Sequence, residues 1–157
     1  MKKAFVIPCL SVLITCCTGH TKLCEEPREV YEYRVTNITG SNIISENELR
    51  SDWKEFVERD TNCPTRIDYD LTNDGHKDFI CMLKDSTGMP YLVAFNNYKT
   101  PNISFQVIDG VADYGNYGIG NIIYLNKDTG GFYSFKLESS KAYIYWKDNK
   151  YLIEYND

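Results

Sequence analysis

Residues 70–78, Asp-Leu-Thr-Asn-Asp-Gly-His-Lys-Asp, have the residue types and the spacing that bind a hard cation. Carboxylates stand at positions 1, 5 and 9 of this segment, and a glycine stands at position 6. Calcium prefers such charged oxygen ligands, and the glycine allows the sharp turn that brings them together. The predicted ligands are Asp70, Thr72, Asp74, the backbone carbonyl of His76, and Asp78.

A calcium ion in this loop would have a structural role, because it would tie together the two strands that flank the loop. The segment is not an EF-hand, since position 12 is Cys81 and not the glutamate that completes that motif. A metal-free turn is the alternative, because the sequence Asn-Asp-Gly at residues 73–75 favours a turn by itself. Repulsion among three carboxylates so close in sequence favours the calcium site over the bare turn.

The stretch from Ile67 to Ile80 resembles the calcium loop of FG-GAP and VCBS-type repeats. In that family the loop holds calcium within a four-stranded blade of a propeller or within a related all-β module. The resemblance covers residues 66–84 and implies the same five ligands. Because the chain carries a single copy of the motif, a complete propeller is excluded.

Segments with a period of two in hydrophobicity surround the loop and predict antiparallel strands. Gly, Asn, Asp and Pro between these segments favour short hairpin turns over the helical crossovers of a parallel sheet. Residues 79–83 and 91–95 are apolar throughout, which predicts central strands that are buried on both faces. The predicted strands are residues 66–70, 78–83, 91–95, 103–108, 122–125, 132–137, 142–147 and 151–155.

Two further elements are predicted before the loop. Residues 29–36 alternate, with Tyr31, Tyr33 and Val35 on one side, and predict another strand.

Ser45 and Glu48 have the spacing of a capping box, which marks the start of a helix. Apolar residues follow at helical spacing: Leu49, Trp53, Phe56 and Val57. The sequence therefore predicts an α+β fold, in which one amphipathic helix packs on a meandering antiparallel sheet of about eight to nine strands.

The chain begins with a cationic start, Met-Lys-Lys, and an apolar run over residues 4–15, as in a secretory signal peptide. This run is too short to span about 30 Å of hydrocarbon. The sequence Leu-Ile-Thr-Cys-Cys that follows resembles a bacterial lipobox, which implies acylation at Cys16 or Cys17. Plain secretion with cleavage near Gly19 is the alternative. The predicted organisation is a signal peptide over 1–16, a tether over 17–28 and one β-rich domain over 29–157.

Export places the later cysteines in an oxidising compartment, where disulfides form. If residues 70 and 78 flank the loop of one hairpin, Cys81 faces residue 67 and Cys63 lies beside residue 85. An offset of about four residues at about 3.3 Å each exceeds the limit of about 7 Å for a disulfide between Cys63 and Cys81. Cys81, in an apolar strand, is expected to be a buried free thiol. Elimination then predicts a disulfide between Cys24 and Cys63.

The 157 residues carry a net charge of −5, although the first fifteen contribute +2. This acidic balance argues against nucleic acid as a partner. The expected location is the bacterial cell envelope, in the periplasm or at the surface, with attachment to the membrane through the lipid anchor.

These features favour an exported, lipid-anchored, calcium-stabilised binding protein without enzymatic activity, whose partner is a protein or a glycan. An inhibitor or an immunity factor against a secreted toxin would fit this description. A small envelope hydrolase that uses the metal or an acidic pair is the alternative. Against it, His20 lies in the predicted tether and His76 in the loop, so a serine or cysteine nucleophile lacks an evident base.

Overall fold

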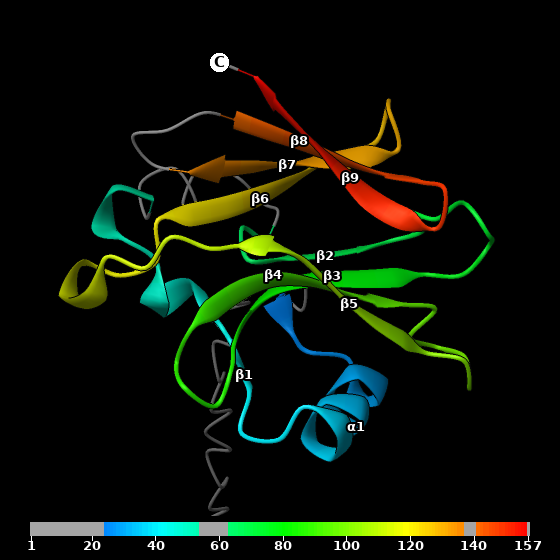
Figure 1. The fold of residues 1–157 in the computed structure, drawn as a ribbon, viewed down its shortest axis with the longest axis horizontal. Helices are drawn as coiled ribbons and strands as arrows, with labels where there is room; N and C mark the ends of the chain where they lie inside the picture. Colours follow the sequence, from blue (N-terminus) through cyan, green and yellow to red (C-terminus); the bar gives the residue numbers. More distant parts are fainter. Residues whose placement is uncertain (1–23, 54–62, 137–140, 157) are drawn as a thin grey trace, which may run out of the picture.

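Two antiparallel sheets and one helix form three layers in the computed structural model, which describes residues 24–53, 63–136 and 141–156 (Figure 1). The helix α1 (Arg28–Asn37) lies against one face of the first sheet, and the second sheet lies against the opposite face (Figure 1). The predicted α+β class and the antiparallel pairing of the strands are confirmed.

The first sheet has the strand order β1-β3-β4-β5, and β2 also pairs with β3. Since β4 takes one edge of β3, the short strand β1 and strand β2 share the other edge, each at its own end. The strands are β1 (Asn42–Ile43), β2 (Arg66–Tyr69), β3 (Asp78–Lys84), β4 (Pro90–Asn96) and β5 (Ser104–Gly110).

The second sheet follows the chain in the order β6-β7-β8-β9. A turn with positive φ at Asp148 (51°) and Asn149 (60°) joins β8 and β9, as the two-residue turn of a tight hairpin requires. The strands are β6 (Asn121–Asn126), β7 (Gly131–Lys136), β8 (Lys141–Lys147) and β9 (Lys150–Asn156).

All eight strands predicted from residue 66 onward are found, but they divide between two sheets where one meander was expected. Stacking the second sheet on the first buries a face that one continuous sheet would leave in water. The two sheets meet at one edge, where the Ile123 N–H donates to the Pro64 carbonyl at 2.8 Å.

The central strands β3 and β4 are buried on both faces, as predicted. On β3, Ile80 and Met82 point toward the second sheet, where they join a core that includes Phe132 and Ile144. The alternate residues, such as Phe79, pack beneath α1. Asp78 begins this strand in the same alternation as Ile80, and its side chain is fully buried.

The prediction of a strand over residues 29–36 is wrong, because these residues form α1. The alternation of tyrosines concealed a helical spacing in which Val30, Tyr33 and Arg34 face the first sheet. The ring of Tyr33 meets Phe95 edge-on at 6.0 Å, whereas Tyr31 is 51% exposed. Long-range packing thus decided the structure of this segment.

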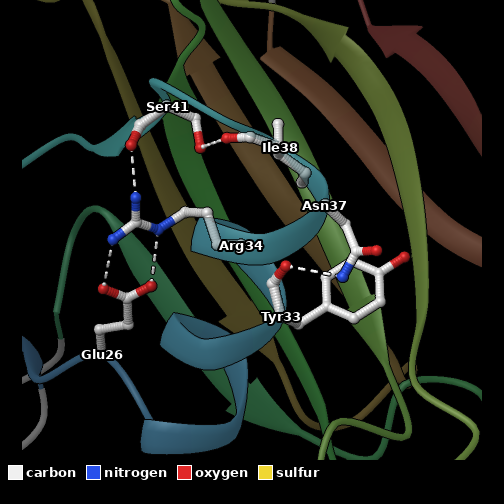
Figure 2. Close-up of polar contacts among 6 residues, drawn as sticks. All are labelled: Glu26, Tyr33, Arg34, Asn37, Ile38 and Ser41. Carbon is white, nitrogen blue, oxygen red and sulfur yellow. Dashed lines mark hydrogen bonds and ion pairs between the residues drawn. The ribbon is translucent and has the colours of Figure 1, made fainter.

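Arg34 is a buried residue of α1, and its side chain contacts the segments at both ends of the helix (Figure 2). Its guanidinium pairs with Glu26, which precedes the helix, and donates to the carbonyl of Ser41, which follows it. At the C-terminal end, the side chain of Asn37 caps the carbonyl of Tyr33 at 2.9 Å (Figure 2).

The helix predicted to begin at Ser45 does not begin there. The capping contact is present, since the Ser45 N–H donates to Glu48 Oε2 at 2.9 Å, but it closes only the 3₁₀ turn η2 (Glu46–Glu48). Leu49 then forms a bridge with Ile119, which draws the backbone into an extended conformation. Residues 51–53 are helical, and the predicted helical residues Phe56 and Val57 lie outside the described residues.

Cys24 and Cys63 form a disulfide with a Cα–Cα distance of 5.4 Å, as predicted. Cys81 is a buried free thiol, also as predicted. It pairs with Arg66 in the β2–β3 register, one residue from the partner expected. The predicted signal peptide, with Cys16 and Cys17, lies outside the described residues. Within the described ranges, none of the helices is both long and apolar enough to cross a membrane.

Candidate metal centre

The predicted calcium loop connects β2 to β3 at one end of the first sheet. Asn73 and Gly75 adopt positive φ angles of 56° and 86°, which turn the backbone sharply. Asparagine and glycine are the residues that tolerate this conformation. The loop therefore has the turn that its sequence predicts.

Asp70 closes the loop through its carboxylate. Its Oδ1 accepts a hydrogen bond from the Asp74 N–H at 3.2 Å, and its Oδ2 accepts one from the Gly75 N–H at 3.0 Å. A carboxylate offers about four acceptor sites, so these two bonds leave capacity for a cation.

Asp78 is the buried anchor of the site. Its Oδ2 accepts from the N–H groups of Leu71 and Thr72 at 2.9 and 3.0 Å, and its Oδ1 accepts from the Asn97 N–H at 3.0 Å. Burial raises the pKa of the Asp78 carboxyl, and these three hydrogen bonds oppose that rise. The loop is thus fastened both to itself and to the turn after β4.

Asp74 is exposed at the tip of the loop and accepts the His76 N–H at 2.9 Å. That bond is the largest cause of the lowered pKa of the Asp74 carboxyl. The side chains of Asn97 and Thr72 also lower it, and the Thr72 side chain acts on Asp78 in the same direction. Thr72 therefore lies beside both carboxylates, and Asn97 lies beside Asp74.

The Asn97 Oδ1 atom is buried and has no hydrogen-bond partner among the residues that the structure describes, whereas the Thr72 hydroxyl acts as a hydrogen-bond donor that lowers the pKa of both Asp74 and Asp78. A buried polar atom without a partner costs about 1–3 kcal/mol. Such oxygens next to carboxylates are the neutral ligands that calcium accepts. The types of donor atom at this position are therefore those that a hard cation binds.

Thr72 was predicted to lie at the site, whereas the proximity of Asn97 was not predicted. Asn97 stands 19 residues beyond Asp78 in the sequence and reaches the loop only because β3 and β4 pair. The available signal was the Asp-Ser-Thr-Gly turn at residues 85–88, which sets the register of that hairpin.

The charge of the site extends to the second sheet through Tyr151. The Tyr151 hydroxyl is buried and donates to Asn96 Oδ1 at 2.8 Å. Burial raises the pKa of Tyr151, and the negative charges of Asp78 and Asp74 raise it further. The only cation of the loop segment, Lys77, pairs with Asp68 on β2 at 3.1 Å and so leaves these two carboxylates unneutralised.

The three carboxylates of Asp70, Asp74 and Asp78 do not converge within 4.8 Å of one another. Across the described ranges, the group of His, Cys, Asp or Glu ligand atoms that does is Cys24, Glu46 and Cys63. Because the two sulfurs are joined in the disulfide, that group offers no thiolate ligand.

A polar hollow of about 370 Å³ opens between the sheets, lined in part by Asp109, Ser134 and Tyr155. Ser134 Oγ accepts a hydrogen bond from the Asn121 carboxamide at 3.2 Å, and an amide is not a general base. Tyr155 donates to Asp109 across this hollow at 3.3 Å. Among the described residues, the hydrogen bonds of Ser134 therefore do not include a general base.

An aromatic surface covers the face of the second sheet that points away from the first. The rings of Tyr143 and Tyr145 stack at 5.5 Å, and Tyr133 lies 5.2 Å from Tyr143. Lys141 places its ammonium 3.5 Å from the centre of the Tyr133 ring. Aromatic rings flanked by hydrogen-bonding groups suit a protein or a glycan partner.

Comparisons of the chain with protein-family models, with curated proteins and with solved structures find no match.

Proposed function

We propose that this chain is an exported, lipid-anchored binding protein of the bacterial cell envelope, stabilised by calcium and without enzymatic activity. The observation that carries the calcium part is the sharp turn of the loop at Asn73 and Gly75, which gathers the carboxylates of Asp70, Asp74 and Asp78 at one end of the first sheet. Hydroxyl and carboxamide oxygens of Thr72 and Asn97 lie beside these carboxylates, and calcium binds such oxygens.

The ligands proposed within the loop are Asp70, Thr72, Asp74, the carbonyl of His76, and Asp78. Bound calcium would supply positive charge, which neutralises the carboxylates and holds the loop against the strands. Its role is structural. Asp70 and Asp78 keep acceptor capacity beyond their backbone hydrogen bonds, and binding would draw the three carboxylates closer together than they lie without an ion.

The proposed calcium affinity is that of an extracellular module, with a dissociation constant on the order of 10⁻⁴ to 10⁻³ M, since the loop has three carboxylates and no bidentate glutamate. Such an affinity is useful outside the cytoplasm, where calcium is abundant. This agrees with the cationic and apolar leader and with the disulfide of Cys24 and Cys63, which suits an oxidising compartment.

For the partner, a protein or a glycan, we favour the aromatic surface of the second sheet as the contact region. The Tyr145 hydroxyl is exposed and bonds Glu154 at 2.8 Å, so rings and hydrogen-bonding groups are available together. An inhibitor or an immunity factor would use such a surface without chemistry of its own.

Thermal unfolding of the mature protein in EDTA, in millimolar calcium and in millimolar magnesium tests the calcium proposal. We expect the melting temperature to rise with calcium and to rise less with magnesium, which prefers fewer protein ligands and more water. A melting temperature that does not respond to calcium would show that the loop is only a turn.

A further inference from the structure

We infer that the polar hollow between the two sheets binds a small acidic sugar, that is, a polyhydroxylated ring that carries a carboxylate. The volume of the hollow, about 370 Å³, lies within the range of about 300–1,000 Å³ that is typical of small-ligand sites. The hollow is at the end of the first sheet away from the calcium loop. It also lies on the inner face of the second sheet, whereas the aromatic surface proposed for the partner covers the outer face.

A β-bulge turns the Asp109 side chain into the space between the sheets. The pairing of β4 with β5 shifts between Leu92 and Val93, so that Leu92 lies opposite Asp109. Opposed residues of an antiparallel pair share a face, and Leu92 is buried in the core toward the second sheet. Without the bulge, Asp109 would share the exposed face of Val107. Bulges that re-aim a side chain in this way are frequent next to active sites.

The wall that faces Asp109 is polar, although the rest of the inner face of the second sheet is apolar. Along β7, Phe132, Ser134 and Lys136 alternate onto this face; Phe132 joins the core, and the other two line the hollow. Asn121 lies opposite Lys136 in the register of β6 with β7. Asn121 and Ser134 are only 5% and 6% exposed. Polar side chains in such a layer cost free energy, so their gathering at one end favours a role in binding.

The Ser134 hydroxyl is available to donate a hydrogen bond to a ligand. The carboxamide oxygen of Asn121 accepts the Ala112 N–H at 2.9 Å, so the amino group of Asn121 is the one that faces Ser134. This amino group donates to Ser134 Oγ at 3.2 Å, and the serine oxygen therefore acts as the acceptor. In the ranges that the structure describes, no group accepts the proton of the Ser134 hydroxyl itself. A ligand oxygen in the hollow would accept it.

Asp109 and Lys136 give the hollow one charge of each sign. Asp109 accepts the Tyr155 hydroxyl at 3.3 Å and the Gly110 N–H at 2.8 Å, which leaves carboxylate lone pairs for the hydroxyl groups of a ligand. The Lys136 ammonium forms no ion pair with any carboxylate of the described residues. A carboxylate on the ligand would supply the missing counter-charge.

The ring of Tyr155 lies at the rim of the hollow and is 60% exposed. A sugar has C–H groups on the faces of its ring and hydroxyl groups around its edge. It can therefore pack against Tyr155 while its hydroxyl groups bond to Asp109 and Ser134. An amino acid would match the two charges, but it has no ring face for Tyr155. An acidic sugar uses all of these groups together.

Titration of sugars into the ¹⁵N-labelled mature protein, followed by the amide chemical shifts, tests the inference. The probes are glucuronic and galacturonic acid, with glucose and galactose as their neutral counterparts and alanine as the amino acid. We expect at least one acidic sugar to bind in the millimolar range and to shift the amides of residues 109–112 and of Ser134. It should bind about tenfold more tightly than its neutral counterpart.

Two variants identify the groups that bind. Lys136→Met removes the ammonium, so the acidic sugar should then bind no more tightly than the neutral one. Asp109→Asn keeps the shape of the side chain but removes its charge, so both kinds of sugar should bind about tenfold more weakly. Lys147→Met is the matched control, because Lys147 is also exposed but lies at the other end of β8 from the hollow. It should bind as the wild type does.

Three results would overturn the inference. The first is that neither acidic sugar shifts the amides around the hollow. The second is a preference for the acidic sugar that is unchanged in Lys136→Met, since Lys136 is exposed and its replacement should not disturb folding. The third is binding of alanine as tight as that of the acidic sugars, which would mean that the hollow recognises the two charges and not a sugar ring.

Discussion

Arg34 and Glu26 form a two-pronged ion pair, with 2.8 Å from Nε to Oε1 and 3.0 Å from Nη2 to Oε2 (Figure 2). Their side chains are only 9% and 18% exposed. Since Arg34 also donates to the Ser41 carbonyl, one guanidinium joins the segments before and after α1. The buried guanidinium is tolerated because Glu26 neutralises its charge and the Ser41 carbonyl accepts a further hydrogen bond from it.

Replacing Glu26 with glutamine should destabilise the protein by about 2 kcal/mol, because it leaves the buried guanidinium without a counter-charge. Urea unfolding measures the change. The control is Glu32→Gln, which breaks the exposed ion pair of Glu32 with Arg28 and should leave the stability unchanged. Equal effects of the two variants would contradict the importance of burial in the Arg34 pair.

The ion pair of Glu48 with Lys84 should make the folding stability of the protein depend on pH in the acidic range. Burial alone would raise the pKa of Glu48, but hydrogen bonds from Lys84 at 2.8 Å and from the Ser45 N–H at 2.9 Å lower it below its usual value. Because the folded pKa is depressed, the stabilisation is present above the ordinary glutamate pKa of about 4.3 and is lost as the pH falls through the folded value.

Glu48→Gln should therefore be less stable than the wild type at pH 7, and the difference should shrink toward pH 3. Urea midpoints at both pH values give the comparison. Lys84→Met, which removes the partner, should show the same convergence. A stability gap for Glu48→Gln that stays constant with pH would mean that the carboxylate charge contributes nothing.

The disulfide between Cys24 and Cys63 closes a sequence separation of 39 residues. Loss of this crosslink in a double serine variant should lower the free energy of unfolding by about 3–4 kcal/mol, because the unfolded chain gains conformational freedom.

Cys81 should resist alkylation until the protein unfolds, since burial raises the pKa of its thiol. Peptide mapping after alkylation of the native protein checks this point; a labelled Cys81 would refute it.

Strands with clear period-two patterns and turn residues between them were predictable, because both signals are local. Residues 79–83 and 91–95 also showed that β3 and β4 are central. The division into two sheets was not predictable, since it depends on how the connection after β5 lets the chain fold back over the first sheet.

The errors arise where contacts distant in sequence decide the outcome. Residues 29–36 alternate as a strand would. As a helix, however, they bury Val30 against the first sheet and bring Arg34 into its ion pair with Glu26. The proximity of Asn97 to Asp78 could not be predicted, because it depends on the β3–β4 register. The proposed loop ligands share one short segment, so their spacing was visible in the sequence.

Lipidation is the prediction that concerns the leader. The run of Leu-Ile-Thr-Cys-Cys at residues 13–17 leads us to expect a mature N-terminus acylated at Cys16 or Cys17. Metabolic labelling with a palmitate analogue in a bacterial host should mark the protein, and replacement of both cysteines with serine should abolish the label. An unlabelled and soluble mature form would instead indicate plain secretion.

Asp74 is the residue whose removal should separate calcium binding from folding. It is exposed, and its carboxylate accepts the His76 N–H and interacts with the Asn97 and Thr72 side chains at the surface, so Asp74→Ala should fold normally. The variant also lacks one of the carboxylates that repel each other without an ion. We therefore expect its melting temperature in EDTA to equal or slightly exceed that of the wild type.

In calcium the order should reverse. At a concentration ten times the dissociation constant, binding adds about 1.4 kcal/mol to the stability of the wild type, and Asp74→Ala should lose this increment. Asp85→Ala is the matched control, because Asp85 also accepts backbone N–H groups in an exposed turn, at 2.8 Å from Thr87 and 3.0 Å from Met89. It should be less stable in EDTA but keep the full calcium response. A calcium response retained by Asp74→Ala would remove Asp74 from the ligand set.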